Sequence, residues 1–167
     1  MTKILIFGLP GSGKSTLAKP LANLLGGVHV NADDVRSRYE GYDKTAWDFS
    51  PAGRLLQAQR MKYISDGVTM SGKIAVADFV CPTDELRKCF EPDFTVYMDT
   101  INKGMYEDTN DLFERPDTSW GGVDYHVAKW FEDTHVQLVP IIERYMKRVS
   151  TTVVGYSAWR MEQSEDK

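Results

Sequence analysis

A short segment near the N-terminus has the residue types and spacing of a phosphate-binding loop. Residues 8–15 read GLPGSGKS and match the pattern G-x-x-x-x-G-K-[ST]. The glycines let backbone N–H groups converge on phosphate oxygens, the lysine reaches the terminal phosphates, and the last hydroxyl binds Mg²⁺. The pattern therefore predicts an ATP and Mg²⁺ site with Lys14 as a catalytic group and Ser15 as a metal ligand. Its predicted nucleotide contacts are Gly11, Ser12, Gly13, Lys14, Ser15 and Thr16.

Carboxylates follow two further apolar runs. Asp33 and Asp34 come after residues 28–30, and Asp78 lies late in the run 74–80. The carboxyl ends of parallel strands border the ligand crevice, where a carboxylate can orient Mg²⁺-bound water or accept a substrate hydroxyl proton. We assign this catalytic and metal-binding role to Asp33, and helix capping to Asp34. Asp78 is the third metal candidate, and it either contacts the Mg²⁺ shell through water or hydrogen-bonds to the phosphate loop.

A sheet of parallel strands would bring these residues to one edge. Apolar runs typical of buried strands alternate with segments in which apolar residues recur at helical spacing, and this alternation indicates parallel pairing. We therefore predict an α/β P-loop NTPase fold, with a five-stranded parallel sheet flanked by helices. The predicted strands are 4–7, 28–30, 74–80, 94–99 and 151–156, and the predicted helices are 15–25, a short one that ends at 39, 51–71, 83–90 and 123–148.

The length of 167 residues is typical of one domain, so we predict a single domain over 1–167. Residues 101–122 contain charged residues, glycine and proline without a sustained period. Such a segment between regular elements is typical of a mobile loop near a ligand. We expect it to be a lid that excludes water from the transferred phosphate.

Composition narrows the class of partner and the compartment. The formal net charge of −4 argues against a reader of duplex DNA and favours a small-molecule substrate, and a homodimer is compatible with it. Cys81 and Cys89 are too few to staple a secreted fold, which favours a reducing compartment. The apolar stretch 4–10 is far shorter than the ~20 residues of a membrane span, and no cleavable signal pattern follows it. We expect a cytoplasmic protein that does not bind membranes.

Two classes of phosphate-loop protein fit the sequence poorly. GTP-binding switches recognise guanine with an N-K-x-D element, whereas residues 102–105 read NKGM and place Met105 at the aspartate position. Motors and multi-subunit ATPases need a larger domain with sensor and arginine-finger elements. A small-molecule kinase is therefore the leading class.

Five segments make the chain resemble the adenylyl-sulfate (APS) kinase family, and one of them, Phe113-Glu114 with Pro116, is similar to the family's Y-E-x-P. Residues 31–36 (NADDVR) look like the family's D-G-D-N-x-R segment, and residues 49–60 resemble its G-F-S-x-x-D-R-x-E-N-x-R-R segment. Residues 79–82 (FVCP) and 103–106 (KGMY) are similar to its F-I-S-P and K-G-L-Y. The resemblance spans roughly 4–117 and implies transfer of the γ-phosphoryl group of ATP to the ribose 3′-hydroxyl of adenylyl sulfate.

The resemblance also implies roles for individual residues. It implies that Phe49 stacks on an acceptor base and that Arg54 is catalytic and grips the acceptor's phosphate or sulfate. The acceptor contacts that it implies are Asp33, Arg36, Phe49, Arg54, Gln57 and Lys103, with Gln57 standing where the family has Asn.

The sequence departs from the family at charged positions. Asp84 replaces an arginine of the family, and Glu107 and Asp108 replace basic residues. These exchanges weaken the positive field expected around an acceptor that carries both phosphate and sulfate. Two alternatives therefore stay open: a kinase for another nucleoside, nucleotide, sugar or polynucleotide hydroxyl, and a nucleotide-binding module that transfers no phosphate.

Overall fold

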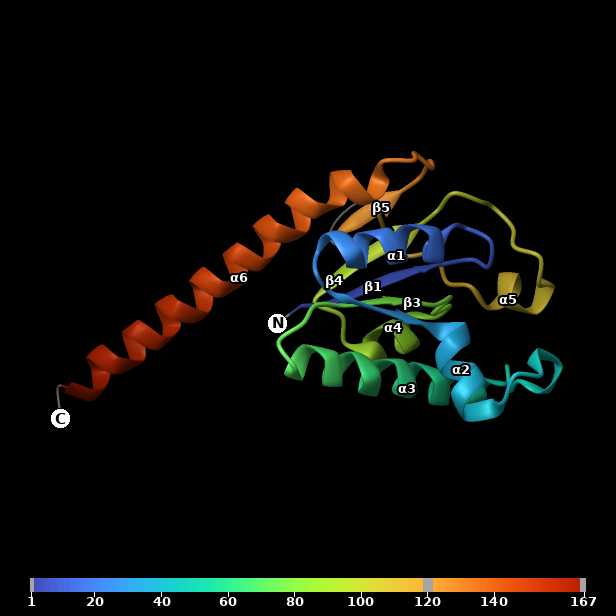
Figure 1. The fold of residues 1–167 in the computed structure, drawn as a ribbon, viewed down its shortest axis with the longest axis horizontal. Helices are drawn as coiled ribbons and strands as arrows, with labels where there is room; N and C mark the ends of the chain where they lie inside the picture. Colours follow the sequence, from blue (N-terminus) through green and yellow to red (C-terminus); the bar gives the residue numbers. More distant parts are fainter. Residues whose placement is uncertain (1, 119–121, 166–167) are drawn as a thin grey trace.

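The computed structural model describes the backbone of residues 2–118 and 122–165, and within these ranges the side chains as far as residue 152. A parallel sheet in the order β2-β3-β1-β4-β5 forms its centre. Every residue of β1 (Lys3–Gly8) is buried, because helices cover both sheet faces, and a strand buried on both faces reads as one apolar run. The predicted α/β fold is confirmed (Figure 1). The other strands are β2 (Val28–Asn31), β3 (Ala75–Asp78), β4 (Phe94–Met98) and β5 (Tyr125–Val127).

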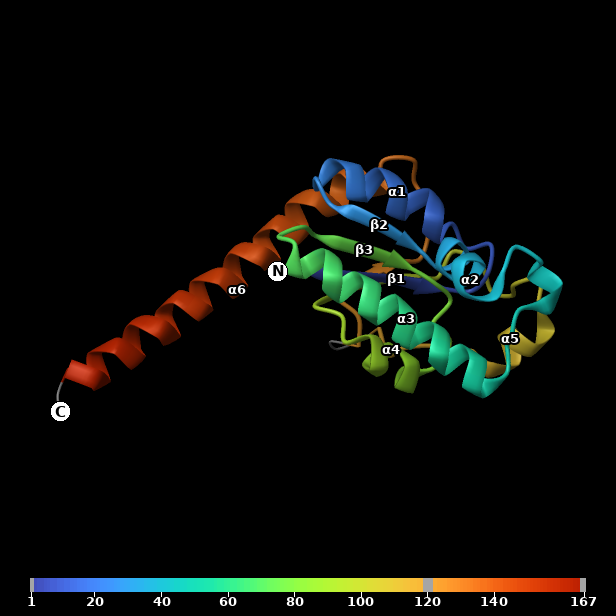
Figure 2. The same cartoon turned by 60° about the horizontal axis from the view of Figure 1, so that its bottom comes forward.

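Helices cover both faces of the sheet (Figures 1 and 2), and alternate residues of β1 build a core on each face. Ile4 packs with Leu17 and Leu138 on one face, and Leu5 packs with Met61 on the other. Each fully buried side chain of this kind stabilises the fold by about 1.5–3 kcal/mol. The helices are α1 (Lys14–Leu24), α2 (Ala32–Glu40), α3 (Pro51–Met70), α4 (Asp84–Phe90), α5 (Glu107–Leu112) and α6 (Thr134–Glu165), with a 3₁₀ turn η1 at Lys44–Ala46.

The first turn of α2 is capped by Asn31. Its side-chain oxygen accepts hydrogen bonds from the backbone N–H groups of Asp33 and Asp34 at 3.0 and 3.1 Å. The prediction that Asp34 caps this helix was wrong, because the helix already begins at Ala32 and a cap must precede the first helical residue. The two aspartates lie instead in the first turn, where negative side chains interact favourably with the helix dipole.

Two predictions for the C-terminal third were also wrong. Residues 151–156 are not the fifth strand but part of α6, and the predicted helix over 123–148 begins only at Thr134. β5 takes the edge beside β4 instead, where Tyr125 pairs with Val96. A three-residue strand has no sequence signature of its own, and the β-branched residues near 152 extend a helix whose first turns pack on the sheet, so context overrides their β propensity.

The segment predicted as a lid contains the short helix α5. Residues 119–121 of the predicted lid lie outside the described residues. Figure 1 shows α5 near the carboxyl ends of the strands, whereas α6 continues away from the sheet at the opposite end. In the ranges that the structure describes, no helix combines the length and apolar character needed to cross a bilayer.

Candidate active site

The phosphate loop joins β1 to α1 through glycines with positive φ. Gly8 has φ +152°, and a Cβ there would lie 2.5 Å from the backbone oxygen of Met98. Gly13 has φ +92° and forms the N-cap of α1 without a side-chain hydrogen bond. The first N–H groups of α1 are therefore left for another acceptor. Such a helix N-terminus favours phosphate by hydrogen bonding and by its dipole.

Lys14 extends from the first position of α1 back across this loop. Its Nζ donates a hydrogen bond to the backbone oxygen of Leu9 at 2.9 Å. Burial lowers the pKa of Lys14 from 10.5 to about 8, although Asp78 and Asp33 raise it in part. Bound phosphate would add negative charge beside the amine and favour its protonated form.

A polar network at the ends of β2 and β3 lies beside the loop. The Asn31 amide donates to Ser15 Oγ at 3.1 Å and to Asp78 Oδ1 at 3.0 Å. His29 Nε2 lies 3.2 Å from the same Asp78 oxygen. The sheet register places Asn31 next to Asp78, which explains how the ends of β2 and β3 meet here. Sequence reasoning missed Asn31 as a site residue. Its position at the carboxyl end of a predicted parallel strand could have indicated this role.

The same network fits Mg²⁺. The other carboxylate oxygen of Asp78, Oδ2, is buried and has no hydrogen-bond partner among the described residues. A buried carboxylate oxygen without a partner is costly unless a cation or its water meets it. Ser15 Oγ supplies a second hard oxygen of the kind that Mg²⁺ prefers. The described residues hold no group of three or more His, Cys, Asp or Glu suited to a metal, so phosphates and waters would supply the remaining ligands.

Asp33 lies in the first turn of α2, close enough to Lys14 for its charge to raise the pKa of that amine. Its side chain is 63% exposed, and its Oδ2 accepts a hydrogen bond from Lys44 Nζ at 2.9 Å. This bond and the charge of Asp33 raise the pKa of Lys44. Lys44 was not singled out from the sequence, because the 3₁₀ turn that carries it lies in a segment predicted as loop.

A cavity of about 570 Å³ connects these groups, and this volume suits a small-molecule site. Lys14, Ser15, Asp33 and Asp78 line it together with three other predicted residues, Gly11, Phe49 and Arg54. The remaining predicted acceptor contacts, Arg36, Gln57 and Lys103, are not among its lining residues.

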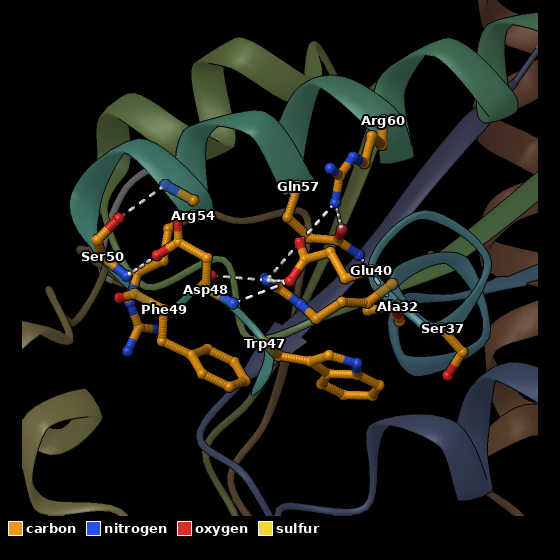
Figure 3. Close-up of polar contacts among 12 residues, drawn as sticks. Ala32, Ser37, Glu40, Trp47, Asp48, Phe49, Ser50, Arg54, Gln57 and Arg60 are labelled. Carbon is orange, nitrogen blue, oxygen red and sulfur yellow. Dashed lines mark hydrogen bonds and ion pairs between the residues drawn. The ribbon is translucent and has the colours of Figure 1, made fainter. Parts of the chain in front are cut away.

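Glu40 is the centre of a cluster of polar contacts beside Trp47 and Phe49 (Figure 3). Arg36 is a buried member of this cluster. The Glu40 carboxylate accepts hydrogen bonds from Arg36 at 3.1 Å, from Arg60 at 2.6 Å and from Asp48 N at 2.8 Å. Burial raises the pKa of Glu40, but these donors together bring it below its ordinary value. Arg36 also donates to the backbone oxygen of Asp48 at 2.7 Å. The structure thus places Arg36 where it supports residues 47–49.

Gln57 and Lys103 also lie away from the cavity. Gln57 is buried and donates to the backbone oxygen of Ala32 at 3.0 Å, which ties α3 to α2. Lys103 is 70% exposed and lies 3.8 Å from Glu107. Their roles as substrate contacts stay predictions.

Aromatic and basic side chains form another part of the cavity wall. The rings of Trp47 and Phe49 lie 6.4 Å apart, and the guanidinium groups of Arg36 and Arg54 lie 4.6 and 5.5 Å from the Phe49 centroid. Arg54 donates to the backbone oxygen of Phe49 at 2.9 Å, and to Asp108 and Thr109 of α5 at 3.2 and 3.1 Å. The cavity is therefore bounded by α5, which belongs to the predicted lid.

Comparisons with known proteins agree with this architecture. A family model described as "AAA domain" matches residues 4–163. No curated protein matches the chain. The APS kinase of Mycobacterium tuberculosis, solved with AMPPNP and APS, superposes with a TM-score of 0.68 and 18% identity, over 85% of this chain and 97% of that one.

Two other kinases superpose over similar lengths. Shikimate kinase of Acinetobacter baumannii, solved with shikimate, gives a TM-score of 0.58 and 19% identity, over 86% of this chain and 94% of that one. A gluconokinase of Sinorhizobium meliloti 1021 gives a TM-score of 0.57 and 14% identity, over 93% of this chain and 97% of that one. At these identities the likeness concerns the fold, which is that of P-loop kinases.

Proposed function

Because the chain belongs to the AAA-domain family and has a P-loop kinase fold, we propose that it transfers the γ-phosphoryl group of Mg·ATP to a hydroxyl of a small acceptor. One observation carries this proposal: the phosphate loop, the carboxylate of Asp33 and an aromatic wall face a single cavity. That cavity has room for an acceptor beside the terminal phosphates.

The nucleotide side of the cavity binds and neutralises the phosphates. The N–H groups at the start of α1 and the Lys14 ammonium surround the terminal phosphates, where negative charge concentrates during transfer. Ser15 and Asp78, the latter through water, would hold Mg²⁺, which when bound supplies further neutralising charge to the phosphate oxygens. Asn31 orients both of these ligands through its amide.

The acceptor side holds the attacking hydroxyl. Asp33 accepts a hydrogen bond from this hydroxyl and takes its proton as the oxygen attacks. Lys44 fixes the orientation of the Asp33 carboxylate through the ion pair described above. α5 covers the acceptor and limits the access of water, which would otherwise compete for the phosphoryl group.

Adenylyl sulfate is the acceptor that the sequence resemblance implies, and it is the first compound to test. A solved neighbour that contains APS supports this choice, but neighbours that bind shikimate or belong to the gluconokinases share the same fold. The cavity geometry therefore supports phosphotransfer more strongly than it supports this acceptor.

Coupled ADP release tests the proposal. Mg·ATP is supplied with adenylyl sulfate and, in parallel, with nucleosides, nucleotides, sugars and 5′-hydroxyl oligonucleotides. We expect release that depends on one class of acceptor and is lost in Asp33→Asn. Nucleotide binding without release for any acceptor would instead favour a binding module that transfers no phosphate.

A further inference from the structure

The charged side chains that line the cavity are balanced in number. Among the residues that the structure describes, they comprise three cations, Lys14, Lys44 and Arg54, and three carboxylates, Asp33, Asp78 and Asp108. Lys14 and Asp78 belong to the nucleotide side. The acceptor side is left with two cations, and each of them is paired with a carboxylate.

The first pair joins Lys44 to Asp33 at 2.9 Å, and the second joins Arg54 to Asp108 at 3.2 Å. The Arg54 side chain is only 9% exposed, and its other bonds go to the backbone oxygen of Phe49 and to Thr109. An anionic group that approached Arg54 would therefore meet the Asp108 carboxylate at the same place. A like charge placed in such a contact is repelled, which disfavours anionic partners.

The basic cluster around Glu40 adds little positive potential. Arg36 and Arg60 share the Glu40 carboxylate, and the Asp48 carboxylate interacts electrostatically with Arg36. Two arginines thus face two carboxylates. Because opposite charges at short range cancel each other's field, no excess of positive charge reaches the acceptor side from this cluster.

We propose that the acceptor is an uncharged hydroxyl compound, either a neutral sugar or the sugar of a nucleoside. This inference rests on the proposed function and narrows it. A hydroxyl group both donates and accepts hydrogen bonds, so it matches a carboxylate next to a cation, whereas an anion can only accept. The half-exposed ring of Phe49 offers an apolar surface to the carbon face of such a molecule.

Turnover on matched acceptors tests this inference. Adenosine is compared with adenosine 5′-phosphate and with adenylyl sulfate, and glucitol with gluconate, at saturating Mg·ATP. We expect kcat/KM to be at least about tenfold higher for the neutral member of a pair, which corresponds to about 1.4 kcal/mol. A higher kcat/KM for any anionic member overturns the inference and leaves the kinase intact.

A second measurement decides the matter even when the panel lacks the natural acceptor. Inorganic sulfate is titrated by calorimetry into protein loaded with Mg·AMPPNP, with sodium chloride as the ionic-strength control. Asp108→Asn frees Arg54, so this variant should bind sulfate at least about tenfold more tightly than the unaltered protein. The matched control Asp111→Asn changes an exposed aspartate of the same helix and should behave as the unaltered protein.

Two further outcomes of the sulfate titration would contradict either the inference or the proposed function. Equal sulfate affinity in Asp108→Asn and the unaltered protein overturns the inference, because the Asp108 carboxylate would then not govern the charge of the acceptor side. Failure of the protein to bind Mg·AMPPNP instead overturns the proposed function on which the inference rests. The two failures are thus distinguished by the loading step itself.

Discussion

The nucleotide side and the acceptor side of the cavity are built in different ways. The nucleotide side uses backbone N–H groups and one lysine from a single turn between β1 and α1. The acceptor side uses side chains from α2, η1, α3 and α5, and its bonds join residues as distant as Arg54 and Asp108. A site built from local backbone keeps its chemistry wherever the motif occurs, whereas a site built from distant side chains can change its ligand by a few substitutions.

Removal of Lys14 should give the largest effect and tests the nucleotide side. Lys14→Ala deletes the charge that faces the terminal phosphates, and we expect kcat/KM to fall by about 10²–10³-fold. Steady-state ADP release measures this loss. Lys19→Ala, an exposed lysine of the same helix, is the matched control and should keep full activity. Equal losses in both variants would contradict a specific role for Lys14.

Removal of the Asp33 carboxylate tests the acceptor side. Asp33→Asn keeps the shape but cannot take a proton, so kcat should fall by about 10²-fold while ATP affinity changes little. Asp34→Asn changes the next residue in the same helical turn and should be nearly silent. Near-normal turnover of Asp33→Asn would exclude Asp33 as the base.

The pH dependence of nucleotide binding separates the two sides further. Because the pKa of Lys14 is lowered to about 8, the free protein loses its ammonium as the pH rises through that value. ATP needs the charged form, so its affinity should weaken above about pH 8 by up to about tenfold per pH unit, with proton uptake on binding. Calorimetry in buffers of different ionisation enthalpy measures both quantities, and Lys14→Ala should abolish the proton uptake.

The Glu40 cluster should show the smallest effect, and mainly on stability. Glu40→Gln leaves Arg36 and Arg60 without their shared carboxylate, and hydrogen bonds to charged groups are worth about 1.5–3 kcal/mol. We expect the free energy of unfolding to fall by about 2–3 kcal/mol in urea titrations, with ATP affinity unchanged. Glu85→Gln, at an exposed position of α4, is the control. A loss of ATP affinity in Glu40→Gln would contradict the separation of the two sides.

Much of the nucleotide side could be predicted from the sequence because its determinants are local. Residues 8–15 form a glycine-rich turn that a buried strand precedes and a helix follows. Each of these three elements is determined by neighbouring residues. The strands β1 to β4 and the helices between them have similarly local patterns. Their order along the chain and the parallel pairing of the strands could therefore be inferred.

The tertiary structure alone decided which side chains meet. Sequence reasoning predicted Arg36 as an acceptor contact, but its position depends on Glu40 and Asp48. The i,i+4 spacing of Arg36 and Glu40 is a local pattern, whereas the contacts of Glu40 with Asp48 and Arg60 depend on the tertiary structure. Sequence reasoning also placed the fifth strand at 151–156, because the pairing of β5 with β4 is set by a free sheet edge and not by local preference. Local propensity and motif spacing are encoded within a few residues, whereas charge pairing and edge pairing depend on contacts between residues far apart in the chain.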